Sequence, residues 1–430
     1  MKKSFPYGRT FLLGFGFLGI SIIWPIFNQF IPIFLQAGNP EFERQLLEAG
    51  RELPSVVGFG LSPALALFIM TWDNILNVFI SPWVGERSDR TWNRFGRRKI
   101  YIILGAPIAI LGFVFIPVAQ SVLAIMVFIL ITNFGMALFR SPTIAWLGDL
   151  FDPDERSKAN GVINLMGGVG GLLAFFGGGI LFNSIGREGP FIAGAVAMTV
   201  ALVVVLVFVK EPRNVEAEKT AAVGVLNNLK VVFRNPDKSG LFVLASILFW
   251  FMGFNALETA LSSFAVFSLG IGAGTASIYA GAVTVSFILF AIPAGWMGTR
   301  FGRRLPIQLG LVGLTLLMVG GYFLIQGAIV FVVVLVLAGF CWAMVNVNSL
   351  PLVYDYGDER RIGAYTGLYY FASQSAAILG PTLGGGFVEM MGSNYRFMWL
   401  FSMLFMALAY LTMTRVKAIK ARPAITPTSP

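Results

Sequence analysis

The sequence predicts an all-α membrane protein of twelve transmembrane helices in two pseudo-symmetric six-helix halves. Three observations predict this fold class. Of the 430 residues, 57% are hydrophobic and 12% are charged, whereas soluble domains carry about 25% charged residues. Twelve apolar stretches approach the roughly 20 residues that a helix needs to cross the hydrocarbon core. A five-residue motif also recurs at long range, which indicates duplicated halves.

Polar breaks separate the twelve apolar stretches. The expected spans are 10–35, 60–84, 100–119, 122–148, 158–183, 190–209, 240–268, 275–298, 306–325, 328–350, 362–391 and 396–414. These runs are continuous and too long for the alternating strands of a membrane β-barrel. A mean hydropathy of +0.78 excludes a chain of soluble domains.

The duplication sets the expected domain boundaries. Arg-Phe-Gly-Arg-Arg at 94–98 recurs at 300–304, and Asp149 recurs as Asp355, both 206 residues later. We therefore expect an N-terminal half at 1–210, a central loop at 211–238, a C-terminal half at 239–414 and a basic tail at 415–430. Within the central loop, Leu226, Leu229 and Phe233 have helical spacing, so that segment is either an amphipathic surface helix or a solvated linker.

The net charge of +10 is distributed unevenly. Of the 31 Lys and Arg residues, 26 lie in the termini and in the loops expected on the same side of the membrane. This positive-inside asymmetry places both termini in the cytoplasm and the protein in the cytoplasmic membrane. Because topology accounts for the charge, no nucleic-acid partner is expected.

The sequence lacks the residues that several kinds of catalysis and metal binding require. The sequence has no histidine, which excludes Ser-His-Asp catalysis and imidazole metal ligation, and no phosphate-binding loop of the G-x-x-x-x-G-K-[S/T] type. Cys341 is the only cysteine and is expected to be buried in the tenth helix. We therefore expect no enzyme activity, no metal and no cofactor, and transport driven by a solute or ion gradient.

The loop after the second span carries a family signature. It contains Gly85, Asp89 and Arg90, followed by the basic run at 94–98. This resembles the G-x-x-x-D-R…G-R-R motif of the major facilitator superfamily, expanded by four residues. The second copy, at 295–304, has Thr299 where the family has Asp.

Two further segments resemble sugar carriers. The expanded loop and the segment ending in Asp149 resemble the plant sucrose carriers and their relatives, which have an Arg at the position of Ile144, one turn after Arg140. Trp72-Asp73-Asn74-Ile75 resembles the second helix of the glycoside-pentoside-hexuronide cation symporters. That resemblance implies a cation-site carboxylate at Asp73. The second Asp of that family is Asn77 here, which favours a proton over Na⁺ as the coupling ion.

The two copies of the basic loop, together with Asp149 and Asp355, predict an inner gate. Topological anchoring alone would explain the basic residues of the loops but not Asp89 or the glycines. In the second half, Arg300 and Asp355 are expected to contribute to the same gate. The gate residues are Gly85, Asp89, Arg90, Arg94, Arg97, Arg98, Asp149, Arg300, Arg303, Arg304 and Asp355.

Ionisable residues inside apolar spans mark function by default. Asp73 and Arg140 are expected at similar central depth, and Asp73, Asn77 and Arg140 form the predicted coupling set. The alternative is a static structural pair of Asp73 and Arg140. Glu258 lies either at the solute site or close to the outer surface.

Polar and aromatic residues of several spans could bind solute hydroxyls and sugar faces. The predicted solute-binding residues are Trp24, Asn28, Arg140, Asn255, Glu258, Trp342, Asn346 and Tyr369. The leading hypothesis is a monomeric, proton-coupled symporter of a sugar or glycoside, whose partners are that small solute and the lipid bilayer. The alternatives are a carrier of anionic or amphiphilic solutes, an efflux antiporter, and a non-transporting sensor or scaffold.

Overall fold

A computed structural model describes residues 5–211, 238–356 and 362–417. Apart from one isolated β-bridge between Asn93 and Gly96, the regular secondary structure of these residues is helical. Each of the twelve predicted spans overlaps a helix of the structure. The segment around Leu226, Leu229 and Phe233 lies outside the described residues.

The described residues of the first half form nine α-helices, one short 3-10 helix and one π-helical turn. They are α1 (Tyr7–Gln36), α2 (Pro40–Glu48), α3 (Pro63–Ile69), α4 (Trp72–Arg90), α5 (Lys99–Phe115), η1 (Ile116–Val118), α6 (Val122–Leu150), α7 (Pro153–Leu172), η2 (Leu173–Gly177), α8 (Gly178–Ile185) and α9 (Gly189–Phe208). The second half contains α11 (Ser239–Phe267), α12 (Ala273–Phe301), α13 (Arg304–Leu324), α14 (Ala328–Tyr356), α15 (Ile362–Met390) and α16 (Phe397–Thr414).

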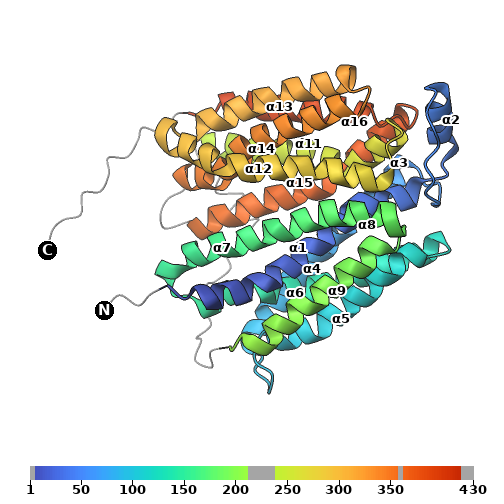
Figure 1. Ribbon diagram of the computed structural model, residues 1–430. Coiled ribbons are helices and arrows are strands. Elements are labelled where there is room, and N and C mark those ends of the chain that lie inside the picture. The colour runs from blue at the N-terminus through green and yellow to red at the C-terminus, as the bar shows by residue number, and fades with distance from the viewer. Residues whose placement is uncertain (1–4, 212–237, 357–361, 418–430) are drawn as a thin grey trace.

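The two halves form two bundles that lie side by side. In Figure 1, α11 to α16 lie above α1 and α4 to α9, and both chain ends leave from one end of the molecule while α2 lies at the other. We call these ends the termini face and the α2 face. Each half has its own hydrophobic core, and α1 packs closely on α7 through glycines: a β-carbon at Gly170 would lie 2.7 Å from the Leu18 carbonyl oxygen.

Twelve transmembrane helices were predicted, and the observed architecture agrees with that fold class. Among the described residues, eleven helical spans are long and apolar enough to cross a membrane. The eleventh predicted span, 362–391, corresponds to the 29-residue helix α15, which is not among these eleven. Its many Gly, Ser, Thr and Tyr residues lower its hydropathy, and this composition suits a helix that faces a polar interior.

The second predicted span is broken rather than continuous. It runs from Pro63 to Arg90, but a turn at Met70 and Thr71 separates α3 from α4. The Thr71 hydroxyl donates a 2.7 Å hydrogen bond to the Phe68 carbonyl, and the Thr71 backbone N–H bonds the same carbonyl. Because this three-residue closure replaces the four-residue helical pattern, the helix ends there and a new one starts at Trp72.

Hydrogen bonds between the described parts of the two halves gather toward the α2 face. Gln36 donates from Nε2 to Ser263 Oγ over 3.0 Å and accepts from the hydroxyl of Tyr395 at Oε1. Arg51, just after α2, donates to the carbonyl of Ser268 over 2.5 Å. The structure therefore has its two halves joined at the α2 face.

Candidate functional site

A cavity of ≈ 380 Å³ lies between the two halves. Five long helices contribute to its wall: α1 and α4 and α6 from the first half, and α11 and α15 from the second. It is lined by Trp24, Asn28, Met70, Asp73, Asn74, Arg140, Phe251, Asn255, Glu258, Thr259, Tyr369, Tyr370, Ser373, Gln374, Ala377 and Pro381. Seven of the predicted site residues therefore meet in one cavity, although they are spread over more than 300 residues of sequence.

Asp73 lies at the start of α4, in the first turn after the break in the second span. A helix N-terminus favours a negative charge because its first N–H groups have no partners within the helix. Asn74 donates a 2.8 Å hydrogen bond from Nδ2 to Asp73 Oδ1. Asn77 is buried and accepts from Ser81 Oγ over 3.0 Å, but it is not part of the cavity wall. The predicted pairing of Asp73 with Asn77 in one site is thus not seen in this conformation.

Arg140 of α6 reaches the same cavity from the other side. Its guanidinium lies over the Trp24 ring, 5.9 Å from the ring centroid. Asp73 and Arg140 share the cavity, but they are not among the ion pairs found at N–O distances up to 4.0 Å in the described part of the chain. A tight static pair of these two residues is therefore not present in this conformation, and both groups face the cavity.

The second half contributes a polar wall from α11 and α15. Asn255, Glu258 and Thr259 line the cavity on α11, so Glu258 lies at the cavity rather than at the outer surface. On α15, sequence analysis identified only Tyr369. The wall also includes Tyr370, Ser373, Gln374, Ala377 and Pro381. These five recur at helical spacing, and that stripe of small and polar residues was the signal that could have predicted them.

Two of the predicted solute-binding residues, Trp342 and Asn346, do not line the cavity in this conformation. Trp342 of α14 is buried and stacks on Phe254 with ring centroids 3.8 Å apart, so it packs behind the wall instead of lining the cavity. Asn346 is also absent from the cavity wall, one turn further along the same helix. Helix α14 packs mainly against α12 and α13, and Trp342 reaches the aromatic rings of α11 behind the cavity wall.

The predicted gate of the first half forms a buried ion-pair network. Asp149 accepts from Arg97 at Oδ1 over 2.5 Å and from Arg98 Nε at Oδ2 over 2.9 Å. Arg98 also donates to Asp89 over 2.5 Å and bonds the Ser88 hydroxyl. Burial lowers the pKa of the Arg98 guanidinium, but hydrogen bonding to Asp149 and the charges of Asp149 and Asp89 outweigh it and raise the pKa overall.

Glu211 completes this network, and sequence analysis gave it no functional role. Its carboxylate accepts backbone N–H groups of Arg97, Arg98 and Lys99, the last two over 3.0 and 2.8 Å, and the indole N–H of Trp146 over 3.1 Å. It therefore caps the N-terminus of α5 with a negative charge. A partner 112 residues away, bonded mainly to backbone, leaves no periodic signal in the sequence.

The remaining residues of the first gate lie nearer the surface. Arg90 pairs with exposed Glu86 over 2.8 Å, and the Arg94 guanidinium lies 4.6 Å from the centroid of the Phe95 ring. A β-carbon at Gly85 would meet Ser141 Oγ at 3.4 Å, an ordinary contact. The close helix approach expected at Gly85 is therefore not used in this conformation.

The second copy of the basic loop has a simpler set of contacts. Asp355 pairs with Arg303 over 2.6 Å, not with Arg300. Arg300 instead lies over the Trp296 ring, 5.1 Å from its centroid. Arg304 donates to the Thr414 carbonyl over 3.1 Å.

The chain is similar to known membrane transporters in sequence and in fold. The model of the Major Facilitator Superfamily matches residues 9–381, with a second match over 264–428. Multidrug resistance protein 2 of Bacillus subtilis (strain 168) is 25% identical over 439 residues, which cover 93% of this chain and 97% of that protein. The sucrose transport protein SUC3 of Arabidopsis thaliana is 26% identical over 147 residues, 29% of this chain and 25% of that protein. The crystal structure of a D-xylose-proton symporter has the same fold, with a TM-score of 0.65 at 16% identity over 95% of this chain and 97% of the other.

Proposed function

Because the chain belongs to the major facilitator superfamily and is therefore a multi-pass secondary transporter, we propose that it carries a sugar or glycoside together with a proton by alternating access. The site is the cavity between the halves, and Asp73 carries the coupling cation. The solute is bound by polar and aromatic side chains of α1, α6, α11 and α15.

The composition of the cavity wall carries this proposal. A volume of ≈ 380 Å³ falls in the range of about 300–1,000 Å³ typical of small-molecule sites. Hydroxyl and amide groups gather opposite aromatic rings, the combination that binds sugar hydroxyls and sugar faces. The Trp24 indole N–H is buried without a hydrogen-bond partner in the described structure. A bound hydroxyl would satisfy it.

We infer that the termini face is cytoplasmic and that the structure is open toward it. The asymmetry of Lys and Arg supports this orientation, and the hydrogen bonds near Gln36 and Arg51 join the halves at the opposite face. Transport then requires the halves to part at the α2 face and to close at the termini face. Solute and cation drive that change only by binding the two states differently.

Asp73 is suited to binding and releasing a proton because some of its surroundings favour the charged form of its carboxyl group and others favour the neutral form. The start of α4 and the Asn74 amide favour its charged form, whereas the apolar surroundings of a membrane interior favour the neutral form. A movement of Arg140 between states would shift this balance and let Asp73 take up and release a proton. The position of the second Asp in the cation symporters is Asn77 here, and Asn77 does not line the cavity, so no second carboxylate of that helix turn is available to bind Na⁺ beside Asp73.

One observation favours a second candidate, the transport of an anionic solute such as a hexuronide. Arg140 faces the cavity without a close acidic partner among the described residues. A solute carboxylate could pair with it.

Uptake in sealed membrane vesicles separates these two functions. Labelled disaccharides, neutral glycosides and hexuronides would be offered with and without an imposed inward proton gradient. A sugar symporter accumulates a neutral sugar only with the gradient. Accumulation of hexuronides alone would favour the second candidate, and gradient-independent extrusion would contradict symport.

The Asp73→Asn variant tests the coupling role. It fixes the neutral form, so uphill accumulation should be lost while exchange of labelled for unlabelled solute continues. Val78→Ala, on the same helix but outside the cavity wall, is the control and should keep accumulation. A well-expressed Asp73→Asn variant that still concentrates solute would refute the role of Asp73.

Orientation can be tested separately with an impermeant thiol reagent. Cysteines placed at Glu48 or Glu188 should be labelled from outside intact cells, and cysteines at Lys219 or Arg422 should not. Lys219 and Arg422 lie outside the described residues, so this assay also reports on segments for which the structure gives no placement. Labelling at Lys219 in sealed cells would reverse the orientation.

A further inference from the structure

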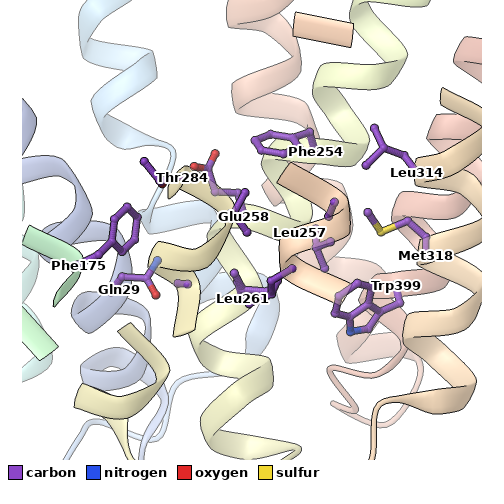
Figure 2. Close-up of a pocket in the computed structure, with 14 residues that line it drawn as sticks. Gln29, Phe175, Phe254, Leu257, Glu258, Leu261, Thr284, Leu314, Met318 and Trp399 are labelled. Carbon is purple, nitrogen blue, oxygen red and sulfur yellow. The ribbon is translucent and has the colours of Figure 1, made fainter. Parts of the chain in front are cut away.

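A second, smaller cavity of ≈ 50 Å³ lies beside the solute cavity, at the contact between the halves. Figure 2 shows its polar side chains, Gln29, Glu258 and Thr284, gathered on one side, with Leu314, Met318 and Trp399 on the other. Gln29 comes from α1 of the first half, and the other two come from α11 and α12 of the second half. The rest of the wall is apolar.

Glu258 belongs to both cavities, so its carboxylate forms part of the boundary between them. On α1 the two cavities divide between neighbours, since Asn28 lines the larger one and Gln29 the smaller one. A small hydrated ion in the solute cavity and one in the smaller cavity would therefore both meet Glu258.

One polar atom of the Gln29 side chain has no hydrogen-bond partner in the described structure. Gln29 is 2% exposed, and its Oε1 is buried without a hydrogen-bond partner in the described structure. A buried amide oxygen without a partner destabilises the folded protein, so such groups normally bind protein, water or an ion.

Glu258 is not part of any ion pair found among the described residues. Across the larger cavity it faces Asp73 on α4, Arg140 on α6, and Tyr369 and Tyr370 on α15. In the smaller cavity no other charged or titratable side chain lines the described wall. A carboxylate between apolar surfaces needs a proton or a cation to offset its charge.

The donor set has the chemistry of a cation site. A carboxylate, an amide oxygen and a hydroxyl are hard oxygen ligands. One carboxylate balances one positive charge, so a monovalent ion leaves the site neutral whereas a divalent ion does not. The volume of ≈ 50 Å³ holds an ion with a few waters, because one water needs at least about 10–15 Å³ of such space. A sugar would not fit.

We propose that Gln29, Glu258 and Thr284 form a binding site for a small monovalent cation, Na⁺ or hydronium, in the smaller cavity, which lies at the contact between the two halves and adjoins the solute cavity at Glu258. Because its ligands come from both halves, an occupied site stabilises the conformation in which the halves meet here. This site does not depend on the identity of the solute or on a coupling role for Asp73.

The test measures cation-dependent stability of the full-length purified protein without solute. The midpoint of thermal unfolding is followed by tryptophan fluorescence while Na⁺ replaces N-methylglucamine at constant ionic strength, and then while the pH falls from about 8.5 to about 6 without Na⁺. We expect a rise of about 2 °C or more in at least one arm. A rise with Na⁺ identifies a sodium site, and a rise only on acidification identifies a proton site.

Variants assign the effect to these residues. Glu258→Gln, Gln29→Leu and Thr284→Val should each remove the rise, and the last two change no charge, so they remain informative if Glu258→Gln fails to fold. Ser262→Ala is the matched control: its buried hydroxyl has no partner and lies one turn from Glu258, but it does not line the cavity. It should keep the full rise.

The proposal is overturned if neither cation gives a rise, if the rise survives in Glu258→Gln, or if Ser262→Ala loses it equally. Asp73→Asn should retain the rise. Loss of the rise in Asp73→Asn but not in Glu258→Gln would assign cation binding to Asp73 instead. Failure of sugar uptake with an intact Glu258-dependent rise would refute the proposed function and leave this site standing.

Discussion

The two copies of the repeated basic loop differ in how deeply their charges are buried. In the first half, Arg97 and Arg98 are 3% and 4% exposed and share Asp149. In the second half, Arg303 and Asp355 form one pair whose side chains are 31% and 41% exposed. A buried charge pair is costly to break, whereas an exposed pair contributes little. One sequence motif has therefore produced a buried ion-pair network in the first half and a partly exposed ion pair in the second.

The difference begins with single residues. Where the first copy has Asp89, the second has Thr299, whose hydroxyl donates to the Trp296 carbonyl of its own helix over 2.8 Å. The first copy also has Glu211 across the N-terminus of α5. Without the carboxylate at 299, Arg300 lies against aromatic rings rather than an acid.

The largest effect is expected from Asp149→Asn. It leaves the guanidinium groups of Arg97 and Arg98 buried without their main acceptor, at a cost of about 3–5 kcal/mol. The midpoint of thermal unfolding and the yield of monodisperse protein measure it. Asp355→Asn is the matched control, with an expected cost of about 0–1 kcal/mol. Equal losses at both positions would remove the contrast between the two gates.

An intermediate effect is expected from Glu211→Gln. The variant loses the negative charge at the start of α5 and part of the acceptor capacity for three backbone N–H groups, a cost of about 1–2 kcal/mol. Glu86→Gln, at an exposed surface pair, is the control and should cost less than about 1 kcal/mol.

Gly96→Ala should mimic the loss of Glu211. Gly96 has φ +124°, and a β-carbon there would lie 2.6 Å from Glu211 Oε2. The substitution combines backbone strain with displacement of the carboxylate. If Gly96→Ala unfolds at the wild-type temperature, the contact between this turn and Glu211 is not important for stability.

The smallest effect is expected from Thr299→Asp, which restores the acidic residue of the first copy. Beside Arg300 and Arg303, a new exposed pair should stabilise the protein by at most about 1 kcal/mol. We expect slower solute exchange if the second gate becomes stronger. Thr299→Ala, which removes only the hydrogen bond to Trp296, should leave exchange unchanged. Faster exchange in Thr299→Asp would contradict the gate assignment.

Much of this fold could be predicted because membrane spans and duplications leave strong sequence signals. The recurrence of Asp149 as Asp355 correctly identified two acidic residues that pair with the basic loops. Charges inside apolar spans were equally informative, since Asp73, Arg140 and Glu258 share one cavity. Such charges are rare in lipid, so each one constrains the interior of the protein.

The parts that could not be predicted depend on helix rotation and on local side-chain bonds. Trp342 seemed available to the solute, but the facing of α14 buries it on Phe254. The break before Asp73 follows from the Thr71 hydroxyl, which replaces a helical hydrogen bond in a run that otherwise reads as continuous. Hydropathy reports that a segment enters the membrane, but it does not report which face of a long helix meets the cavity.

Cys341 has a practical consequence for measuring the motion between the halves. It is the only cysteine of the chain and lies buried in α14, where a β-carbon on Gly313 would lie 2.6 Å from its Sγ. One substitution to alanine, which adds no volume, therefore gives a cysteine-free background. Spin labels could then be attached in chosen pairs across the two ends of the molecule. Distance distributions from such pairs would show directly how often each end is apart, with and without a candidate solute or cation.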